Sequence, residues 1–173
     1  MFNRLIFVAA ITTVVCFAAA CGDDDPIVVP TPVSKIVTFK ATMNGAGEVP
    51  VNATTGTGTF TATLDTSTNV FTYDLTFTGL TSNVNNGHIH GPAAVGVNSG
   101  TTINFNTLAG ATFGFGAQAG TGHGTIVLNA GTQVTTTING DSLKKLLFAG
   151  LTYANIHTVN NAGGEIRGQI TKQ

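Results

Sequence analysis

Residues 59–77 read TFTATLDTSTNVFTYDLTF and contain the pattern that decides the fold. Apolar and polar residues alternate over residues 60–64 and again over residues 71–77. Successive side chains of a strand point to opposite faces, so each run predicts a strand with one apolar and one Thr-rich face. Residues 65–69 between them, DTSTN, have the composition of a hairpin turn. The stretch therefore predicts an antiparallel sheet with one buried and one solvated side.

Further runs with the character of β-strands recur along the chain from residue 35. They are residues 37–43, 88–90, 102–108, 124–128, 134–138, 153–158 and 165–170. Together with the two runs above, they predict about nine short strands separated by turns rich in Gly and Asn. This organisation indicates one all-β domain over residues 35–173, folded as a Greek-key sandwich or barrel.

One short helix is expected to interrupt the strands near residues 141–150. Asp141 or Ser142 is a suitable N-cap, and Gly150 is a suitable C-terminal stop. Three leucines between them share one helical face: Leu143, Leu146 and Leu147. We expect this helix to close one end or corner of the barrel.

The composition narrows the class of protein. Charged residues make up 9% of the 173 residues, with 7 Lys and Arg against 8 Asp and Glu. This balance argues against nucleic acid as a partner, because no basic excess is present to neutralise phosphates. A hydrophobic fraction of 42% is too high for a disordered chain. The 30 Thr and 22 Gly favour strands and turns over helices.

The N-terminal segment has the features of a secretion signal. Arg4 provides a positive start, residues 5–20 carry no charge, and small residues precede Cys21. This end resembles a bacterial lipoprotein signal, in which the Cys becomes the lipidated first residue of the mature chain. The alternative is an ordinary secretion signal followed by an unpaired Cys. We expect residues 1–20 to be a signal peptide and Cys21 to be lipidated.

Residues 21–34 predict a tether between this anchor and the folded domain. The stretch 22–34, GDDDPIVVPTPVS, holds three acids and three prolines, a composition typical of an extended linker. The lipid would hold the domain at a membrane surface. Because Gly22 follows the Cys, the lipoprotein resemblance implies the outer membrane of a bacterial cell envelope, with the domain on its periplasmic or its outer side.

Histidines are the residues with the clearest chemical potential. His88 and His90 flank Ile89, so on a strand both imidazoles lie on one face while Ile89 enters the core. His157 alternates in the same way with Ile156, and pairing of the two strands would bring three imidazoles together. Nitrogen ligands of this kind suit copper, zinc or nickel, and three histidines are sufficient for copper. The alternative is structural: the three rings hydrogen-bond backbone or Thr groups and hold strand ends together.

Polar residues near these histidines are candidates for supporting a metal site. Asn155 shares the face of His157, and Glu165 and Arg167 alternate on one face of the last predicted strand. We expect these three side chains to support the metal ligands from behind. The alternative for Glu165 and Arg167 is a polar ladder that fixes strand register. Glu48 is expected either to pair with Arg167 or to be solvated.

Four stretches resemble the chordin-type (CHRD) domain family across residues 36–171. They are FKATMNGAGEV (39–49), GHIHGPA (87–93), YANIHT (153–158) and GGEIRGQI (163–170). The resemblance implies a secreted or extracellular domain, present in a regulator of animal growth-factor signalling and in bacterial envelope proteins. It implies no established enzymatic activity.

A second resemblance is to copper/zinc superoxide dismutase. It rests on residues 87–90 (GHIH), 155–157 (NIH) and 161–163 (NAG). It implies a Greek-key barrel with copper ligands at His88, His90 and His157, whereas an immunoglobulin-like sandwich also accommodates the strand pattern. The chain has no counterpart of the histidine that bridges copper to zinc, no zinc cluster and no disulfide pair. If the domain is an enzyme, this resemblance implies a copper-only activity of the superoxide dismutase type.

Two functional hypotheses follow. In the first, the chain is a lipid-anchored envelope protein whose domain is a non-catalytic binding or structural module for an extracellular protein or glycan, since no pattern of catalytic residues is recognisable. In the second, the chain is a copper-binding protein for storage, delivery or redox protection through His88, His90 and His157. Retention of copper by the purified protein distinguishes the two hypotheses.

Overall fold

The structure is a computed structural model that describes residues 35–173. The predicted signal peptide (1–20), the lipidated Cys21 and the tether (21–34) lie outside the described residues. Within residues 35–173, no helix combines the length and the hydropathy that a membrane span requires.

The described residues form nine strands, one α-helix and one 3-10 helix. In chain order these are β1 (Ile36–Asn44), η1 (Gly45–Gly47), β2 (Thr57–Asp65), β3 (Val70–Thr78), β4 (Val84–His90), β5 (Thr101–Asn104), β6 (Thr112–Phe113), β7 (Gly120–Val127), α1 (Gly140–Phe148), β8 (Thr152–Thr158) and β9 (Ile166–Lys172). The predicted all-β class with one short helix is confirmed.

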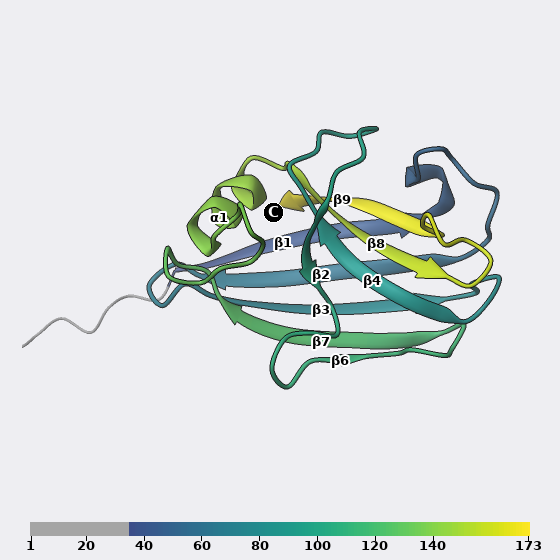
Figure 1. Cartoon of the computed structure of the whole chain (residues 1–173), viewed down its shortest axis with the longest axis horizontal. Helices are drawn as coiled ribbons and strands as arrows, with labels where there is room; N and C mark the ends of the chain where they lie inside the picture. Colours follow the sequence, from purple (N-terminus) through teal and green to yellow (C-terminus); the bar gives the residue numbers. More distant parts are fainter. Residues whose placement is uncertain (1–34) are drawn as a thin grey trace, which may run out of the picture. The chain divides into compact units, whose positions relative to one another are not determined.

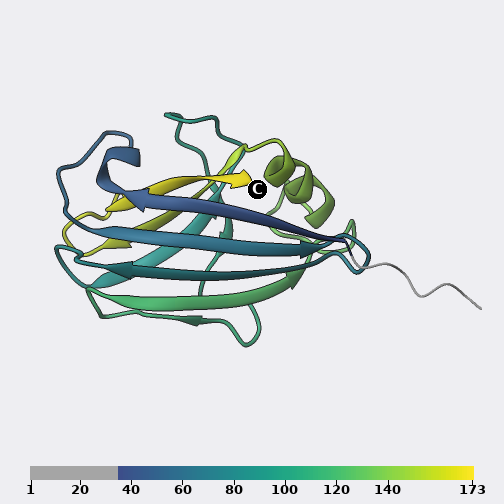
Figure 2. The same ribbon diagram turned by 180° about the vertical axis from the view of Figure 1, so that it is seen from behind.

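The strands form one antiparallel sheet in the order β5-β4-β8-β9-β1-β2-β3-β7-β6. The sheet curls into two layers, so that β4, β8 and β9 lie across β1, β2, β3 and β7 (Figure 1). Figure 2 shows the molecule from behind, with the layer of β1, β2, β3 and β7 in the foreground. The chain changes layer after β3, after β5 and after β7. The predicted sandwich or barrel is therefore present as a strongly curled sheet.

The core between the layers follows the alternation of residues 59–77. Alternate side chains of β2 and β3 are buried, and most Thr side chains between them are exposed. Phe60, Tyr73 and Phe105 form a buried aromatic group with ring centroids between 5.0 and 6.2 Å apart. The Tyr73 hydroxyl donates to the Phe105 carbonyl over 3.0 Å, so its polar atom is satisfied inside the core.

Helix α1 closes one end of the two layers, next to the end of β9 (Figure 1). Asn139 is its N-cap and accepts a hydrogen bond from the Ser142 N–H at 2.9 Å, so the predicted cap at Asp141 or Ser142 is wrong. Asp141 instead lies in the first turn, where an acidic side chain also favours the helix. Gly150 has a φ of +67° and follows the C-cap residue Ala149, which confirms the predicted stop. The buried helical face contains Leu143 and Leu147.

Residues 134–138 form a bend rather than the predicted strand. The Thr135 hydroxyl accepts hydrogen bonds from the backbone N–H groups of Thr137 and Ile138. These local bonds satisfy backbone groups that a strand would pair with a neighbour. The strand was predicted from the Thr-rich composition, but the hydrogen bonds of the Thr135 side chain to the backbone produce a bend.

Two strand boundaries also differ from the prediction. β5 ends at Asn104, whereas the sequence predicted a strand as far as residue 108. β7 begins at Gly120 rather than at residue 124. His123 therefore lies within a strand.

Candidate metal centre

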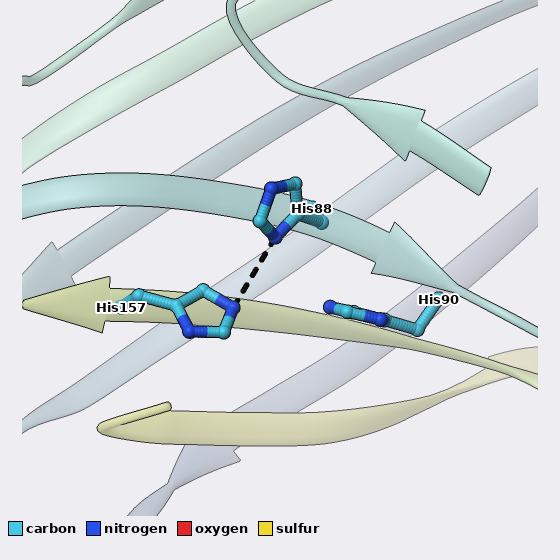
Figure 3. Close-up of side chains that lie close together, drawn as sticks. All are labelled: His88, His90 and His157. Atoms are coloured by element: carbon cyan, nitrogen blue, oxygen red, sulfur yellow. Dashed lines mark hydrogen bonds between the residues drawn. The ribbon is translucent and has the colours of Figure 1, made fainter. Parts of the chain in front are cut away.

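Strands β4 and β8 are neighbours in the sheet and bring the three predicted histidines together. The register places His90 opposite Tyr153 and Asn86 opposite His157. Ile89 is fully buried in the core, so the flanking His88 and His90 lie on the other face of β4. Figure 3 shows the three rings converging on this face from β4 and β8.

The nitrogen atoms of the three rings are close enough to share one ion. His88 Nδ1 lies 3.2 Å from His157 Nε2, and one ligand nitrogen from each of the three rings lies within 4.8 Å of the others. A transition metal binds imidazole nitrogen at about 2.0–2.1 Å, so two ligands of one ion lie roughly 3–4 Å apart. A small adjustment of His90 would complete a three-nitrogen site.

Backbone carbonyls fix the orientation of two of these rings. His90 Nδ1 lies 2.9 Å from the Ser99 carbonyl oxygen, and His157 Nδ1 lies 3.0 Å from that of Ala162. A carbonyl only accepts hydrogen bonds, so both Nδ1 atoms carry the proton and both Nε2 atoms are unprotonated. His90 Nε2 is buried and has no hydrogen-bond partner within the described chain. The rings are thus held as metal-ligating histidines usually are, with Nδ1 tied to a carbonyl.

Burial keeps the three imidazoles neutral. Burial, and to a smaller extent the neighbouring His157 and His90 rings, lower the pKa of His88 from 6.5 to about 4. Burial also lowers the pKa of His90 and of His157, although the Ser99 and Ala162 carbonyls oppose this change. A neutral imidazole is the form that binds a metal ion, so metal binding at neutral pH requires no imidazolium to lose its proton.

Tyr153 and Arg167 extend the site sideways across the sheet. The Tyr153 ring is stacked on His90, with centroids 4.7 Å apart and an angle of 6° between the planes. The Arg167 guanidinium carbon lies 3.4 Å from the centre of the Tyr153 ring. The Tyr153 hydroxyl also contacts the backbone N–H and the carbonyl of Ser99. Sequence analysis missed this role of Tyr153, whose signal was its place on the same strand face as His157.

The polar residues predicted to support the ligands make their hydrogen bonds elsewhere. Asn155 donates to Glu48 Oε1 at 2.6 Å and to the Ile166 carbonyl at 3.0 Å. Arg167 donates to Val97 O at 2.7 Å and to Asn98 Oδ1 at 2.9 Å. Within the described chain neither side chain has a hydrogen bond to an imidazole. Arg167 reaches His90 through Tyr153 instead.

Glu165 is fully buried and serves the structure of the loops. Its carboxylate accepts hydrogen bonds from Thr54, Thr81, Thr158 and Asn161. Burial alone would raise its pKa, but the bonds from Thr158, Thr54 and Thr81 hold the pKa below its usual range. Neither a pairing of Glu165 with Arg167 nor a contact of Glu165 with the histidines occurs among the ion pairs and hydrogen bonds of residues 35–173.

Glu48 is 5% exposed, so the expectation of a solvated side chain is wrong. Burial raises its pKa to about 7, and the hydrogen bond from Asn155 and the charge of Arg167 only partly offset this change. The Glu48 carboxyl group is close enough for the charge of Arg167 to lower its pKa, but the two form no ion pair within the described residues.

His123 lies away from the cluster, on the exposed face of β7. Its Nδ1 is 2.8 Å from Asp74 Oδ1 on the neighbouring strand β3, and both side chains are about half exposed or more. This histidine is not part of the three-nitrogen site and provides a matched control for it.

Comparison with known protein families gives a match over most of the folded domain. The model of the CHRD domain family matches residues 39–170. No curated protein and no solved structure matches the chain. The resemblance to superoxide dismutase stays a prediction from the sequence. Because the matched region contains every stretch that carried the first resemblance and all three histidines of the cluster, the chain belongs to the CHRD domain family.

Proposed function

We propose that this chain is a CHRD module of the bacterial cell envelope that captures one copper ion through His88, His90 and His157. The observation that carries the proposal is the convergence of three neutral ring nitrogens within 4.8 Å. The buried Nε2 of His90, which has no partner within residues 35–173, points to a missing ligand.

Structural hydrogen bonding accounts for only part of this arrangement. It explains the contacts of His90 with Ser99 and of His157 with Ala162, and the contact between His88 and His157. It leaves His90 Nε2 buried and unpaired, which costs about 1–3 kcal/mol. A metal ion would use this lone pair, so metal binding accounts for an atom that the structural alternative does not.

Copper is favoured among the metals that bind imidazole. The cluster offers nitrogen donors alone, which suit copper, zinc and nickel, and three such donors are sufficient for copper. The polar side chains around the cluster are engaged in hydrogen bonds with the loops rather than with the imidazoles. No polar side chain of the described residues is thus placed to assist a reaction at the imidazoles, which favours a non-catalytic binding module. Its role would be storage, delivery or redox protection.

The anchoring part of the proposal rests on the sequence. The uncharged segment 5–20 followed by Cys21 supports lipidation, and the Asp- and Pro-rich stretch 22–34 supports a tether. The module would then present its copper site at the surface of the outer membrane.

Metal retention tests the proposed function. The full chain, purified without a polyhistidine tag, is incubated with copper or with zinc, desalted, and analysed for metal per chain by mass spectrometry. We expect about one copper per chain in the unmodified protein and in His123→Ala, and less than about a tenth of that in His157→Ala. Equal retention in His157→Ala, or no retention in any chain, would contradict the proposal.

A further inference from the structure

The ligands of the three-histidine site bring no negative charge to a bound ion. Among the described residues, the cluster within 4.8 Å contains His88, His90 and His157 and no carboxylate. An imidazole binds a metal ion through a ring nitrogen as a neutral ligand. The full charge of the ion is therefore left uncompensated by its ligands.

Two of the three ligands are shielded from water, whereas His157 is half-buried. His88 is 9% and His90 is 8% exposed, and Ile89 between them packs in the core. The solvation energy that an ion loses on burial rises with the square of its charge. A divalent ion is therefore penalised about four times as much as a monovalent ion of the same size.

A fixed cation lies beside the site. In the sheet, β8 lies between β4 and β9, so Tyr153 on β8 separates His90 on β4 from Arg167 on β9. The stack of Arg167 on Tyr153 and of Tyr153 on His90 holds the guanidinium near the ligands. Hydrogen bonds to Val97 and Asn98 keep Arg167 in this position. Because Arg stays charged at all physiological pH values, it repels a divalent ion more than a monovalent ion.

We propose that the site is built for cuprous rather than cupric copper, and that Arg167 strengthens this preference through its stack on Tyr153 and His90. The inference rests on the proposed function, since it specifies which copper ion the site takes. The number of donors agrees with it: cupric copper favours a tetragonal site with four or more ligands, whereas three nitrogen donors satisfy the cuprous ion.

The carboxyl group that interacts with Arg167 is that of Glu48, which donates no ligand to the cluster. When ionised, Glu48 offsets part of the charge of Arg167. Its pKa is raised to about 7, so at pH 6 it is mostly protonated and the effect of Arg167 is measured almost alone. The tests are therefore made at pH 6 and repeated at pH 8.

Separate affinities for the two copper ions test the inference. The full chain is titrated with Cu(II) against nitrilotriacetate. It is titrated under nitrogen with Cu(I), prepared by one-electron reduction of Cu(II) with ascorbate, against bicinchoninate. The same measurements are made on Arg167→Gln, which removes the charge, and on Arg167→Lys, which keeps it. Circular dichroism and thermal melting confirm that each variant is folded, and an exposed-site variant, His123→Ala, is the matched control.

We expect the Kd for Cu(I) to be at least about tenfold lower than the Kd for Cu(II). We expect Arg167→Gln to reduce the ratio of the Cu(II) Kd to the Cu(I) Kd about tenfold at pH 6. Arg167→Lys and His123→Ala should largely preserve this ratio. Cu(II) affinity equal to or greater than Cu(I) affinity overturns the inference while leaving copper binding intact. An unchanged ratio in a folded Arg167→Gln overturns the role of Arg167. Retention of neither ion overturns the proposed function and this inference with it.

Discussion

His88 Nδ1 lies 3.2 Å from His157 Nε2 across the β4–β8 pair, although 69 positions separate the two residues in sequence. Because His157 Nδ1 donates to the Ala162 carbonyl, its Nε2 accepts, and His88 Nδ1 donates the proton between them. A metal ion would take the place of that proton, with His88 carrying its hydrogen on Nε2 instead. The fold therefore holds two of the three rings at the separation that one ion requires.

Copper should stabilise the folded chain, because it binds a site that only the folded state assembles. At a free copper concentration 100 times Kd, the free energy of unfolding should rise by about 2.7 kcal/mol. Urea unfolding with and without copper measures this change. His123→Ala should show the same increase and His157→Ala should show none, so an increase retained in His157→Ala would place the bound copper elsewhere.

The metal-free protein should lose stability in acid through its buried histidines. Burial lowers the pKa of folded His88 from an ordinary 6.5 to about 4. The unfolded state therefore binds more protons between these values, and stability present above pH 6.5 is lost as the pH falls toward 4. Relative to His88→Gln, the unmodified protein should lose about 2–3 kcal/mol between pH 7 and pH 4.5. A constant difference between the two chains over this range would contradict the assigned burial of His88.

Glu48 should act in the opposite direction. Burial raises the pKa of this carboxyl from 4.5 to about 7, so the folded state binds more protons than the unfolded state between these values. Its contribution to stability is fully present below pH 4.5 and is lost as the pH rises through 7. Relative to Glu48→Gln, the unmodified protein should lose about 3 kcal/mol between pH 4.5 and pH 8. Urea midpoints over this range measure the effect, and parallel pH profiles of the two chains would exclude it.

Strand faces could be predicted from the sequence because alternation is a local property. His88 and His90 around Ile89 required only a period of two, as did the buried face of residues 71–77. Strand pairing depends on contacts between distant segments. The sequence could therefore predict that His157 meets His88 only on the condition that their two strands pair. The Thr-rich run 134–138 shows the limit of composition, since local side-chain bonds produce a bend there.

The surroundings of the site were less predictable for the same reason. Glu165 collects donors from the loops around Thr54, Thr81 and Asn161, which lie far apart in the sequence. Its partner could therefore not be inferred from its alternation with Arg167. Arg167 and His90 are linked because Tyr153 on the intervening strand stacks against both of them.

Mutation can distinguish the stability contributed by the N-cap of α1 from that contributed by its first turn. Asn139 accepts a hydrogen bond from Ser142 N–H at 2.9 Å, whereas the Ser142 side chain has no capping contact within the described residues. Asn139→Ala should lower the free energy of unfolding by about 1 kcal/mol, and Ser142→Ala should change it by less than about 0.5 kcal/mol. Thermal or urea unfolding measures both. Equal losses of stability in the two variants would contradict the assignment of Asn139 as the N-cap.

Glu165→Gln should destabilise the domain severely, even though the two side chains have the same shape. Glu165 Oε1 accepts from the Thr81 backbone N–H at 2.6 Å, and Oε2 accepts from the Asn161 amide at 3.1 Å. Thr hydroxyls can rotate to donate or accept, but these two N–H groups only donate. Whichever way the Gln amide is oriented, its NH₂ group faces one of them and leaves buried donors without an acceptor. We expect a loss of about 3 kcal/mol at pH 7.

The matched control is Asp74→Asn, which changes an exposed carboxylate that pairs with His123 and should cost less than about 1 kcal/mol. The pKa of Glu165 is held below its usual range, so its stabilising effect is present at neutral pH and is lost as the pH falls through the folded pKa. The gap in stability between the unmodified protein and Glu165→Gln should therefore narrow in acid. Urea unfolding at pH 7 and at pH 4 measures the gap. A gap of equal size at both pH values would contradict the assignment of the stabilisation to the ionised carboxylate of Glu165.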